Sequence, residues 1–125
     1  MGDKLDTIFE LRESFMKELR SFKKTSSPAT WPLKLTNKKD QQVCRDIALR
    51  GVEEMFEALQ HLKNWKPHRK TRVSSFDREE FLEEVVDAFN YFFSLLILTG
   101  VDQDEFFEAY KKKDKIIRER IKTGY

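Results

Sequence analysis

The spacing of apolar residues constrains the fold of this chain more than any other feature of its sequence. Four segments carry apolar side chains at intervals of three and four residues, which places those side chains on one face of an α-helix. The first predicted helix runs from about Lys4 to Lys24 and ends before a Thr-Ser-Ser-Pro run that favours a turn. The second opens at Thr36 or Asn37, each a good N-cap, and continues to about Asn64.

Two further predicted helices follow a basic loop. The residues that can cap their starts are Ser74, Ser75 or Asp77 for the third helix and Asp102 or Asp104 for the fourth. The third helix runs to about Thr99 and stops at Gly100, because a glycine commonly follows the last residue of a helix. The fourth ends at Gly124-Tyr125.

The composition agrees with a wholly helical fold. The 125 residues include only four Gly and three Pro, so helix breakers are few. This length suits a single domain spanning residues 1–125. We therefore predict an all-α protein, a bundle of four to five helices. The eleven Phe exceed what one thin layer of four helices can bury, so we expect a homodimer or homotetramer.

Charge and cysteine content argue against several classes of function. The 24 basic and 22 acidic side chains nearly cancel, so nothing favours nucleic-acid binding. The single Cys44 rules out an internal disulfide and a cysteine-based zinc site, and it suits a reducing cytosol. The first residues lack the apolar stretch of a signal peptide, and the longest apolar run, Phe92 to Thr99, is too short to span a bilayer. We expect a cytoplasmic protein with no membrane or nucleic-acid partner.

Two pairs of acidic residues indicate the chemistry. Glu54 and Glu57 lie three residues apart in the second predicted helix, and Glu84 and Asp87 do so in the third. Residues at this spacing share one helical face. A single such pair among 22 acids is usually an exposed helix face, but two pairs on consecutive helices can face each other. Four carboxylates that close repel one another, and Mg²⁺ or Mn²⁺ would neutralise them because these hard cations prefer oxygen ligands.

Asp87 is the most informative of the four acids. Apolar residues flank it along the third predicted helix, Val85 and Val86 before it and Ala88 and Phe89 after it. A carboxylate embedded among apolar side chains is costly unless it is paired or bound to a metal. We therefore expect Asp87 to be embedded in this way and to bind a metal ion.

The four acids also resemble the metal-binding pattern of a known superfamily. Glu54-x-x-Glu57, 26 intervening residues and then Glu84-x-x-Asp87 resemble the all-α nucleoside triphosphate pyrophosphohydrolases, which include MazG-like enzymes and the dimeric dUTPases. The apolar run that leads from these acids to Gly100 is similar to the corresponding stretch in the branch of dimeric dUTPases and phage dCTPase-dUTPases. The resemblance covers essentially the whole chain.

The C-terminal tail carries the more specific part of the resemblance. The tail runs from Tyr110 through Lys113 to Arg120 and the closing Tyr125. The resemblance implies that Lys113, Arg120 and Tyr125 contact the triphosphate, because they match family positions that do so. The resemblance implies hydrolysis of a deoxynucleoside triphosphate to its monophosphate and pyrophosphate. It also implies two or three Mg²⁺ or Mn²⁺ ions held by the four acids, with Glu54 as the candidate general base.

The residues expected to read the base depart from the family pattern. A Gln and an Asn that bind uracil in dimeric dUTPases correspond to Arg12 and Met16, and a common His corresponds to Asn90. Trp31 matches an aromatic residue that stacks on the base, or it anchors the connection between helices. The family default is dUTP, whereas Arg12 would suit a purine such as dGTP, and dCTP is a further alternative. Arg12 either lies in the base pocket or is an ordinary surface residue, and we favour the surface.

Other readings lead to different functions. Phe-rich helix faces also suit a non-catalytic helical interaction module, although such a module has no reason to keep four acids together. A di-iron bundle normally uses Glu-x-x-His pairs, and this sequence has none. His61 and His68 have no implied carboxylate partner, so metal ligation by histidine is not expected. The basic loop from Lys63 to Arg72 is read as solvent-exposed, with a phosphate-binding lid as the alternative.

Overall fold

The computed structural model describes residues 2–22 and 31–124, and every regular element in these ranges is a helix. In chain order the elements are α1 (Lys4–Phe22), α2 (Lys38–Leu59), α3 (Arg78–Leu98) and α4 (Gln103–Thr123). The all-α prediction is therefore confirmed, with four helices. The predicted end of the first helix, Lys24, lies outside the described residues.

Local side-chain bonds fix where three helices begin. Of the candidate caps, the structure selects Asn37, Asp77 and Asp102. Asn37 accepts hydrogen bonds from the backbone N–H groups of the second and third residues after it, and the two aspartates each accept one from the third. These bonds satisfy amide groups that have no partner inside the helix. Gly100 follows α3 with a φ of +82°, which glycine adopts without strain.

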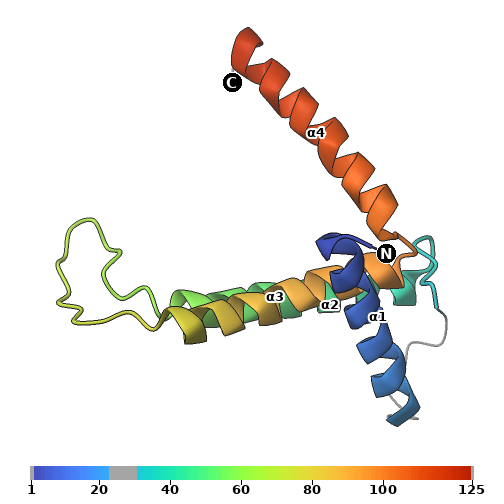
Figure 1. Ribbon diagram of the computed structural model, residues 1–125, viewed down its shortest axis with the longest axis horizontal. Helices are drawn as coiled ribbons and strands as arrows, with labels where there is room; N and C mark the ends of the chain where they lie inside the picture. Colours follow the sequence, from blue (N-terminus) through green and yellow to red (C-terminus); the bar gives the residue numbers. More distant parts are fainter. Residues whose placement is uncertain (1, 23–30, 125) are drawn as a thin grey trace.

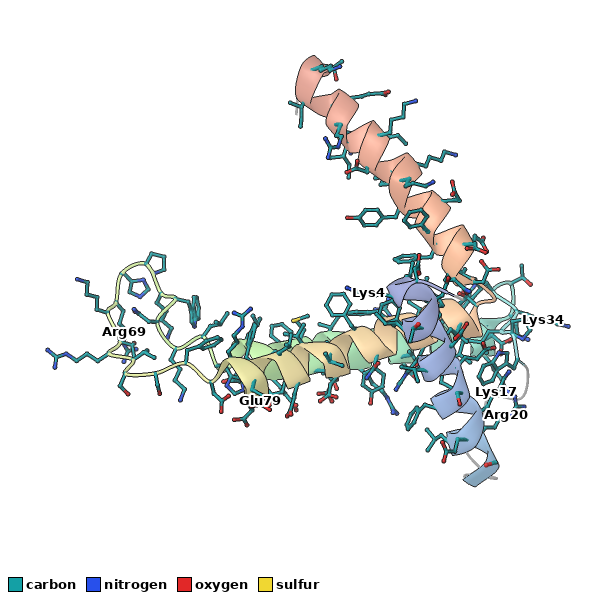
Figure 2. The ribbon with its side chains drawn as sticks, viewed as in Figure 1. Lys4, Lys17, Arg20, Lys34, Arg69 and Glu79 are labelled. Atoms are coloured by element: carbon teal, nitrogen blue, oxygen red, sulfur yellow. The ribbon has the colours of Figure 1, made fainter. Side chains whose placement is uncertain are left out.

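The second helix is shorter than the sequence predicts. It ends at Leu59 rather than near Asn64. Its last backbone bonds are contracted, because His61 and Leu62 each donate to the carbonyl three residues back. This tighter hydrogen bonding ends the α-helix. An extended, exposed loop then leads to α3, and Figure 2 shows its cationic side chains, Arg69 among them, pointing away from the helices.

α2 and α3 form an antiparallel pair that lies side by side along its length (Figure 1). Small residues allow the close approach. Ala58 and Ala88 are completely buried, and a Cβ placed on Gly51 would come within 2.7 Å of the Phe92 ring. A side chain at position 51 would therefore not fit between the helices as they lie.

A second cluster ties α1 and α4 to the C-terminal end of α3. The buried ring of Phe9 on α1 lies 5.4 Å from that of Phe93 and 6.2 Å from that of Phe106, between ring centroids. The segment before α2 joins the same end, where Leu33 donates its backbone N–H to the Leu98 carbonyl at 2.6 Å. α1 therefore crosses the end of the α2–α3 pair (Figure 1).

α4 projects away from the other three helices (Figure 1). It has no buried residue, and Tyr110 and Ile121 are 66% and 71% exposed. The single chain is thus more open than a closed four-helix bundle. Within the described ranges, no helix is both long and apolar enough to cross a membrane.

Candidate functional site

The α2–α3 pair brings the four predicted acids into one electrostatic group. Glu54 and Glu57 occupy two successive turns of α2, and Glu84 and Asp87 occupy α3 alongside. The pKa of Glu54 is raised, first by partial desolvation, then by the charge of Glu57 and a hydrogen bond with it, and then by the charges of Asp87 and Glu84. The neighbouring carboxylates therefore make ionisation of Glu54 less favourable than that of an isolated glutamate.

The exposure of these acids differs from the expectation for Asp87. Glu54 and Glu84 are half-buried, whereas Glu57 and Asp87 are exposed. Two of the four apolar neighbours of Asp87 are open, since Val86 is 50% and Phe89 is 47% exposed, whereas Val85 is half-buried and Ala88 is buried. The expectation that Asp87 is embedded among apolar side chains is therefore wrong for the single chain, because α2 covers only one side of α3. The like charges nearby, rather than burial, are what make this carboxylate a candidate ligand.

A pocket of about 470 Å³ adjoins the acids. Residues from α1, α2 and α3 and from the segment before α2 form its wall: Arg12, Phe15, Met16, Leu19, Arg20, Trp31, Val43, Asp46, Ile47, Arg50, Tyr91, Ser94 and Leu98. Arg50 lies one helical turn before Glu54, and Tyr91 lies one turn after Asp87. The pocket and the acid group are therefore neighbouring parts of one surface, and a volume of this size accommodates a small ligand.

Arg12 belongs to this pocket, so the surface position that the sequence favoured is wrong. Its Nε donates to Ser94 Oγ at 2.8 Å, and its guanidinium carbon lies 4.8 Å from the centroid of the Phe15 ring. Partial burial lowers the pKa of Arg12, and the charges of Tyr91 and Asp87 oppose that effect. Arginine stays protonated in proteins, so the pocket contains a fixed, oriented cation. The contact that holds Arg12 is with α3, 82 positions away in sequence, and helical periodicity alone does not reveal it.

The other two predicted base-binding residues have different positions. Trp31 is half-buried and lines the pocket, with the Arg20 guanidinium 5.8 Å from its ring centroid. Asn90 is half-buried on α3 but is not among the residues that line the pocket. The structure therefore brings Arg12 and Trp31 together and leaves Asn90 aside.

The predicted phosphate-binding residues lie apart from the acids in the single chain. Lys113 and Arg120 are exposed on α4, the helix that projects away, and neither lines the pocket. Tyr125 lies outside the described residues. One chain thus supplies the acids and the pocket, while its tail cations point elsewhere.

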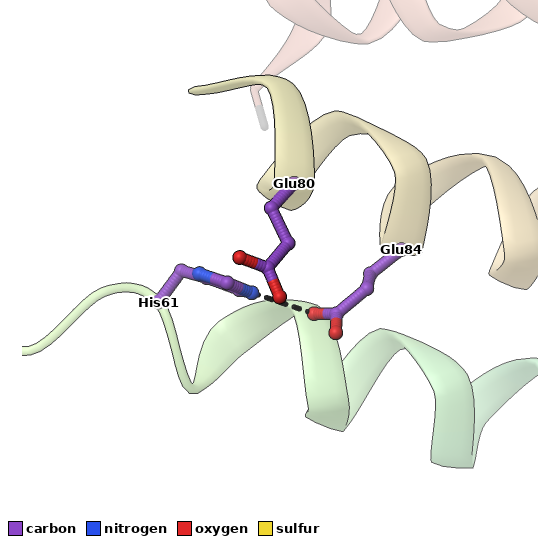
Figure 3. Close-up of side chains that lie close together, drawn as sticks. All are labelled: His61, Glu80 and Glu84. Carbon is purple, nitrogen blue, oxygen red and sulfur yellow. Dashed lines mark hydrogen bonds and ion pairs between the residues drawn. The ribbon is translucent and has the colours of Figure 1, made fainter. Parts of the chain in front are cut away.

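His61 also belongs to the site, although its sequence context did not predict this. His61 Nε2 lies 2.8 Å from Glu84 Oε2, so this histidine has the carboxylate partner that the sequence did not suggest (Figure 3). A signal was available, since His61 follows Glu57 by four residues and therefore continues the same helical face. With Glu80, these two residues place three possible ligand atoms within 4.8 Å of one another.

Comparison with protein-family models, with curated proteins and with solved structures yields no match for this chain. Its function is therefore inferred from the residues of the site.

Proposed function

We propose that this chain is a metal-dependent diphosphohydrolase that converts a deoxynucleoside triphosphate to the monophosphate and pyrophosphate. The observation that carries the proposal is the mutual position of the acid group and the pocket. The acids offer oxygen ligands for cations beside a space that suits a nucleoside. A nucleotide needs both, because its phosphates bind divalent cations while its base and sugar need a partly apolar pocket.

The four carboxylates fit a cation on chemical grounds. Desolvation and then the charges of the neighbouring acids raise the pKa of Glu54, and a divalent ion among the four carboxylates would relieve their repulsion. Glu54, Glu57, Glu84 and Asp87 would hold two or three Mg²⁺ or Mn²⁺ ions. When bound, Mg²⁺ would neutralise charge at the phosphate oxygens and lower the pKa of a water that a general base then deprotonates.

Individual side chains have distinct roles in binding and catalysis. Glu54 is the candidate general base, as the resemblance implies, because its carboxylate lies in the acid group where it can accept a proton from a water that the group would hold. The exposure of Glu57 and Asp87 leaves the acid group open to a triphosphate arriving from solvent. Trp31 offers a ring face on which a base stacks, and the wall beside it is mostly apolar.

The position of Arg12 favours one group of bases. Its Nε is used by Ser94, which leaves the terminal nitrogens to bond two neighbouring acceptors on the ligand. Guanine (O6 and N7) and cytosine (O2 and N3) present such a pair, whereas uracil places a donor between its two carbonyls. Although dUTP is the substrate that the resemblance implies, Arg12 favours dGTP or dCTP.

The decisive experiment is a pyrophosphate-release assay with all common dNTPs and NTPs, with and without Mg²⁺. We expect Mg²⁺-dependent release with at least one substrate, and the loss of essentially all turnover in Asp87→Asn with helical circular dichroism unchanged. Asp77→Asn, which changes an acid of the α3 cap outside the group, is the matched control. Absence of release with every substrate, or full activity in Asp87→Asn, would contradict the proposal.

A second assay tests the role of Arg12. We expect Arg12→Met to lower kcat/KM for the preferred nucleotide by about 10- to 100-fold, the usual value of one bidentate contact to a base. Activity with dUTP should change much less, so the preference narrows or reverses. An equal loss with every nucleotide would mean that Arg12 supports the fold of the pocket and does not read the base.

One observation favours the alternative function, a non-catalytic interaction module. α4 exposes Phe107, Tyr110 and Ile121, side chains that suit contact with another protein. Such a module needs neither the acid group nor the pocket. The same assay separates the two functions, because only the enzyme releases pyrophosphate.

A further inference from the structure

A mixed group of metal-ligating side chains lies at the loop end of the α2–α3 pair. His61 Nε2, an oxygen of Glu80 and an oxygen of Glu84 are all within 4.8 Å of one another (Figure 3). His61 and Glu84 are also in direct contact at 2.8 Å, and their side chains are 20% and 27% exposed. Glu80 is exposed, so it can rotate toward the other two.

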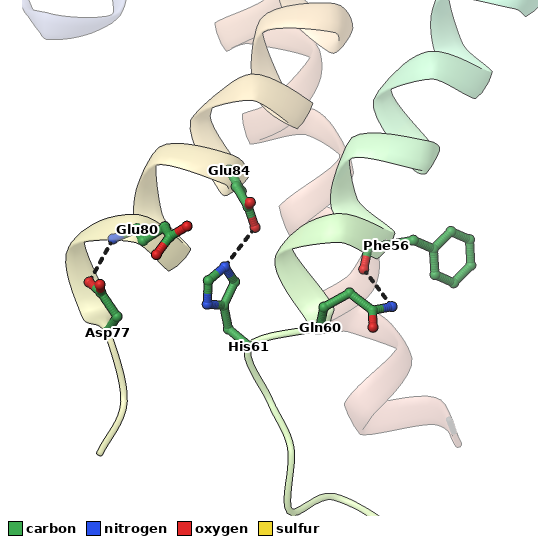
Figure 4. A network of polar contacts seen from close by, with 6 residues as sticks. All are labelled: Phe56, Gln60, His61, Asp77, Glu80 and Glu84. Atoms are coloured by element: carbon green, nitrogen blue, oxygen red, sulfur yellow. Dashed lines mark hydrogen bonds and ion pairs between the residues drawn. The ribbon is translucent and has the colours of Figure 1, made fainter.

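Local structure holds these side chains in place. His61 lies in the tight turn that follows α2, where its backbone N–H donates to the Ala58 carbonyl at 3.2 Å. Its ring packs edge-on against Phe81, with centroids 6.3 Å apart. Glu80 belongs to the first turn of α3, where its N–H donates to the Asp77 cap (Figure 4). Both ends of the cluster are thus anchored by the backbone.

The cluster continues the acid group in a regular pattern. Glu54 and Glu57 lie on α2 and His61 lies in the turn just after it, at separations of three and then four residues. The possible ligands on α3, in the reverse direction, are Asp87, Glu84 and Glu80, again separated by three and then four. Because the helices run antiparallel, both sets follow the same order toward the loop, where His61 contacts Glu84 and lies near Glu80. Only the pair at the loop end includes a nitrogen ligand.

We propose that His61, Glu80 and Glu84 form a second metal site, which shares Glu84 with the four-acid group and suits a borderline transition-metal ion, Zn²⁺ best. Imidazole nitrogen suits Zn²⁺ but not Mg²⁺, which prefers oxygen ligands throughout. Two ligands of a tetrahedral zinc ion, each about 2.0–2.1 Å from it, lie about 3.3 Å apart. The His61–Glu84 distance of 2.8 Å needs only a small opening to admit the ion. Three protein ligands leave a fourth position for water.

Glu84 belongs to both groups, so the two sites are coupled. A carboxylate has two oxygens and can bridge neighbouring ions. Zinc at the His61 site would therefore change how Glu84 serves the four-acid group. The proposal itself concerns metal binding and holds whether or not the chain is a hydrolase.

The two histidines of the chain make the test direct. Ring ¹⁵N signals of His61 and His68 in the full-length protein are followed during addition of ZnCl₂ alone, above the usual histidine pKa of about 6.5. We expect the His61 signals to shift with saturation while those of the exposed His68 stay in place. Glu80→Gln should weaken zinc binding at least about tenfold, in the range reported for altered metal-site partners. Asp87→Asn should leave the His61 response intact.

Four results would overturn the proposal. An unchanged His61 signal would mean that the His61–Glu84 contact is only an ion pair. Equal shifts of His61 and His68 would indicate non-specific binding. Wild-type affinity in Glu80→Gln would exclude Glu80 as a ligand. Loss of the His61 response in Asp87→Asn would place the zinc ion in the four-acid group, with His61 sensing it only through Glu84.

Discussion

At the scale of single residues, Glu54 shows how a site can oppose the stability of its own fold. Its pKa is raised because folding partly desolvates it and places Glu57, Asp87 and Glu84 nearby. A carboxyl whose folded pKa is above the unfolded value stabilises the folded state at acidic pH. That contribution is lost as pH rises through the raised pKa. Without cations, Glu54 therefore works against folding at neutral pH.

The neutral variant Glu54→Gln should reverse this effect. In the absence of divalent ions we expect it to have a higher Tm than the parent at neutral pH. The difference should shrink as pH falls below the ordinary glutamate pKa of about 4.3. Mg²⁺ should raise the Tm of the parent more than that of the variant, because only the parent has the full charge to neutralise. Thermal unfolding across pH, with Glu53→Gln on the same helix as control, measures this. A lower Tm for Glu54→Gln at neutral pH would contradict the expectation.

At the scale of elements, the α2–α3 pair is the rigid support of the site, and Gly51 determines how close the two helices lie. Any side chain there would meet the ring of Phe92, whose nearest atom would be 2.7 Å from the added Cβ. The acids lie one turn further along α2 and opposite on α3. Their mutual distances thus depend on this contact.

A larger residue at position 51 should therefore destabilise the pair. We expect Gly51→Val to lower the free energy of unfolding by about 1–3 kcal/mol, the usual cost of overpacking. Chemical denaturation measures the change. Adding Phe92→Leu should recover part of the loss, because it shortens the ring that meets the new side chain. Simple additivity of the two substitutions would show that the contact is not the cause.

Local signals predicted the elements well and their arrangement less well. The caps at Asn37, Asp77 and Asp102 follow from hydrogen bonds within three residues, so the sequence contains the needed information. The pairing of Arg12 with Ser94 and of His61 with Glu84 joins residues far apart in the chain. Such contacts depend on how helices cross, which periodicity does not specify. The acid group was predictable because both helices repeat the same spacing.

At the scale of the whole molecule, α4 is the element that the single chain does not bury. Phe107, Tyr110 and Ile121 are 49%, 66% and 71% exposed, and Lys113 and Arg120 lie on the same projecting helix. We propose that a second copy of the chain covers α4. The cationic side chains of α4, Lys113 and Arg120, would then reach the triphosphate bound by that second copy. Assembly and activity would then depend on the same helix.

Substitution on α4 tests this assembly. We expect the parent to sediment as a dimer or tetramer and Ile121→Lys to raise the dissociation constant by about tenfold or more, which corresponds to about 1.4 kcal/mol. Lys112→Gln on the same helix is the control. Sedimentation velocity over a range of concentrations measures the change. A parent that stays monomeric at every concentration would contradict the proposed assembly.

The acids of α2 and α3 have matching spacings, and this has a consequence for how the sequence can vary. These spacings depend on the two helices and not on the length of the connection between them. Residues 64–74 can therefore be lengthened or shortened while the acids of α2 and α3 keep their positions relative to each other, as expected of an exposed loop. A single insertion inside either helix would instead rotate all later ligands by about 100° and separate the two sets. Natural relatives and engineered versions should accordingly differ in the loop and conserve the helical spacing.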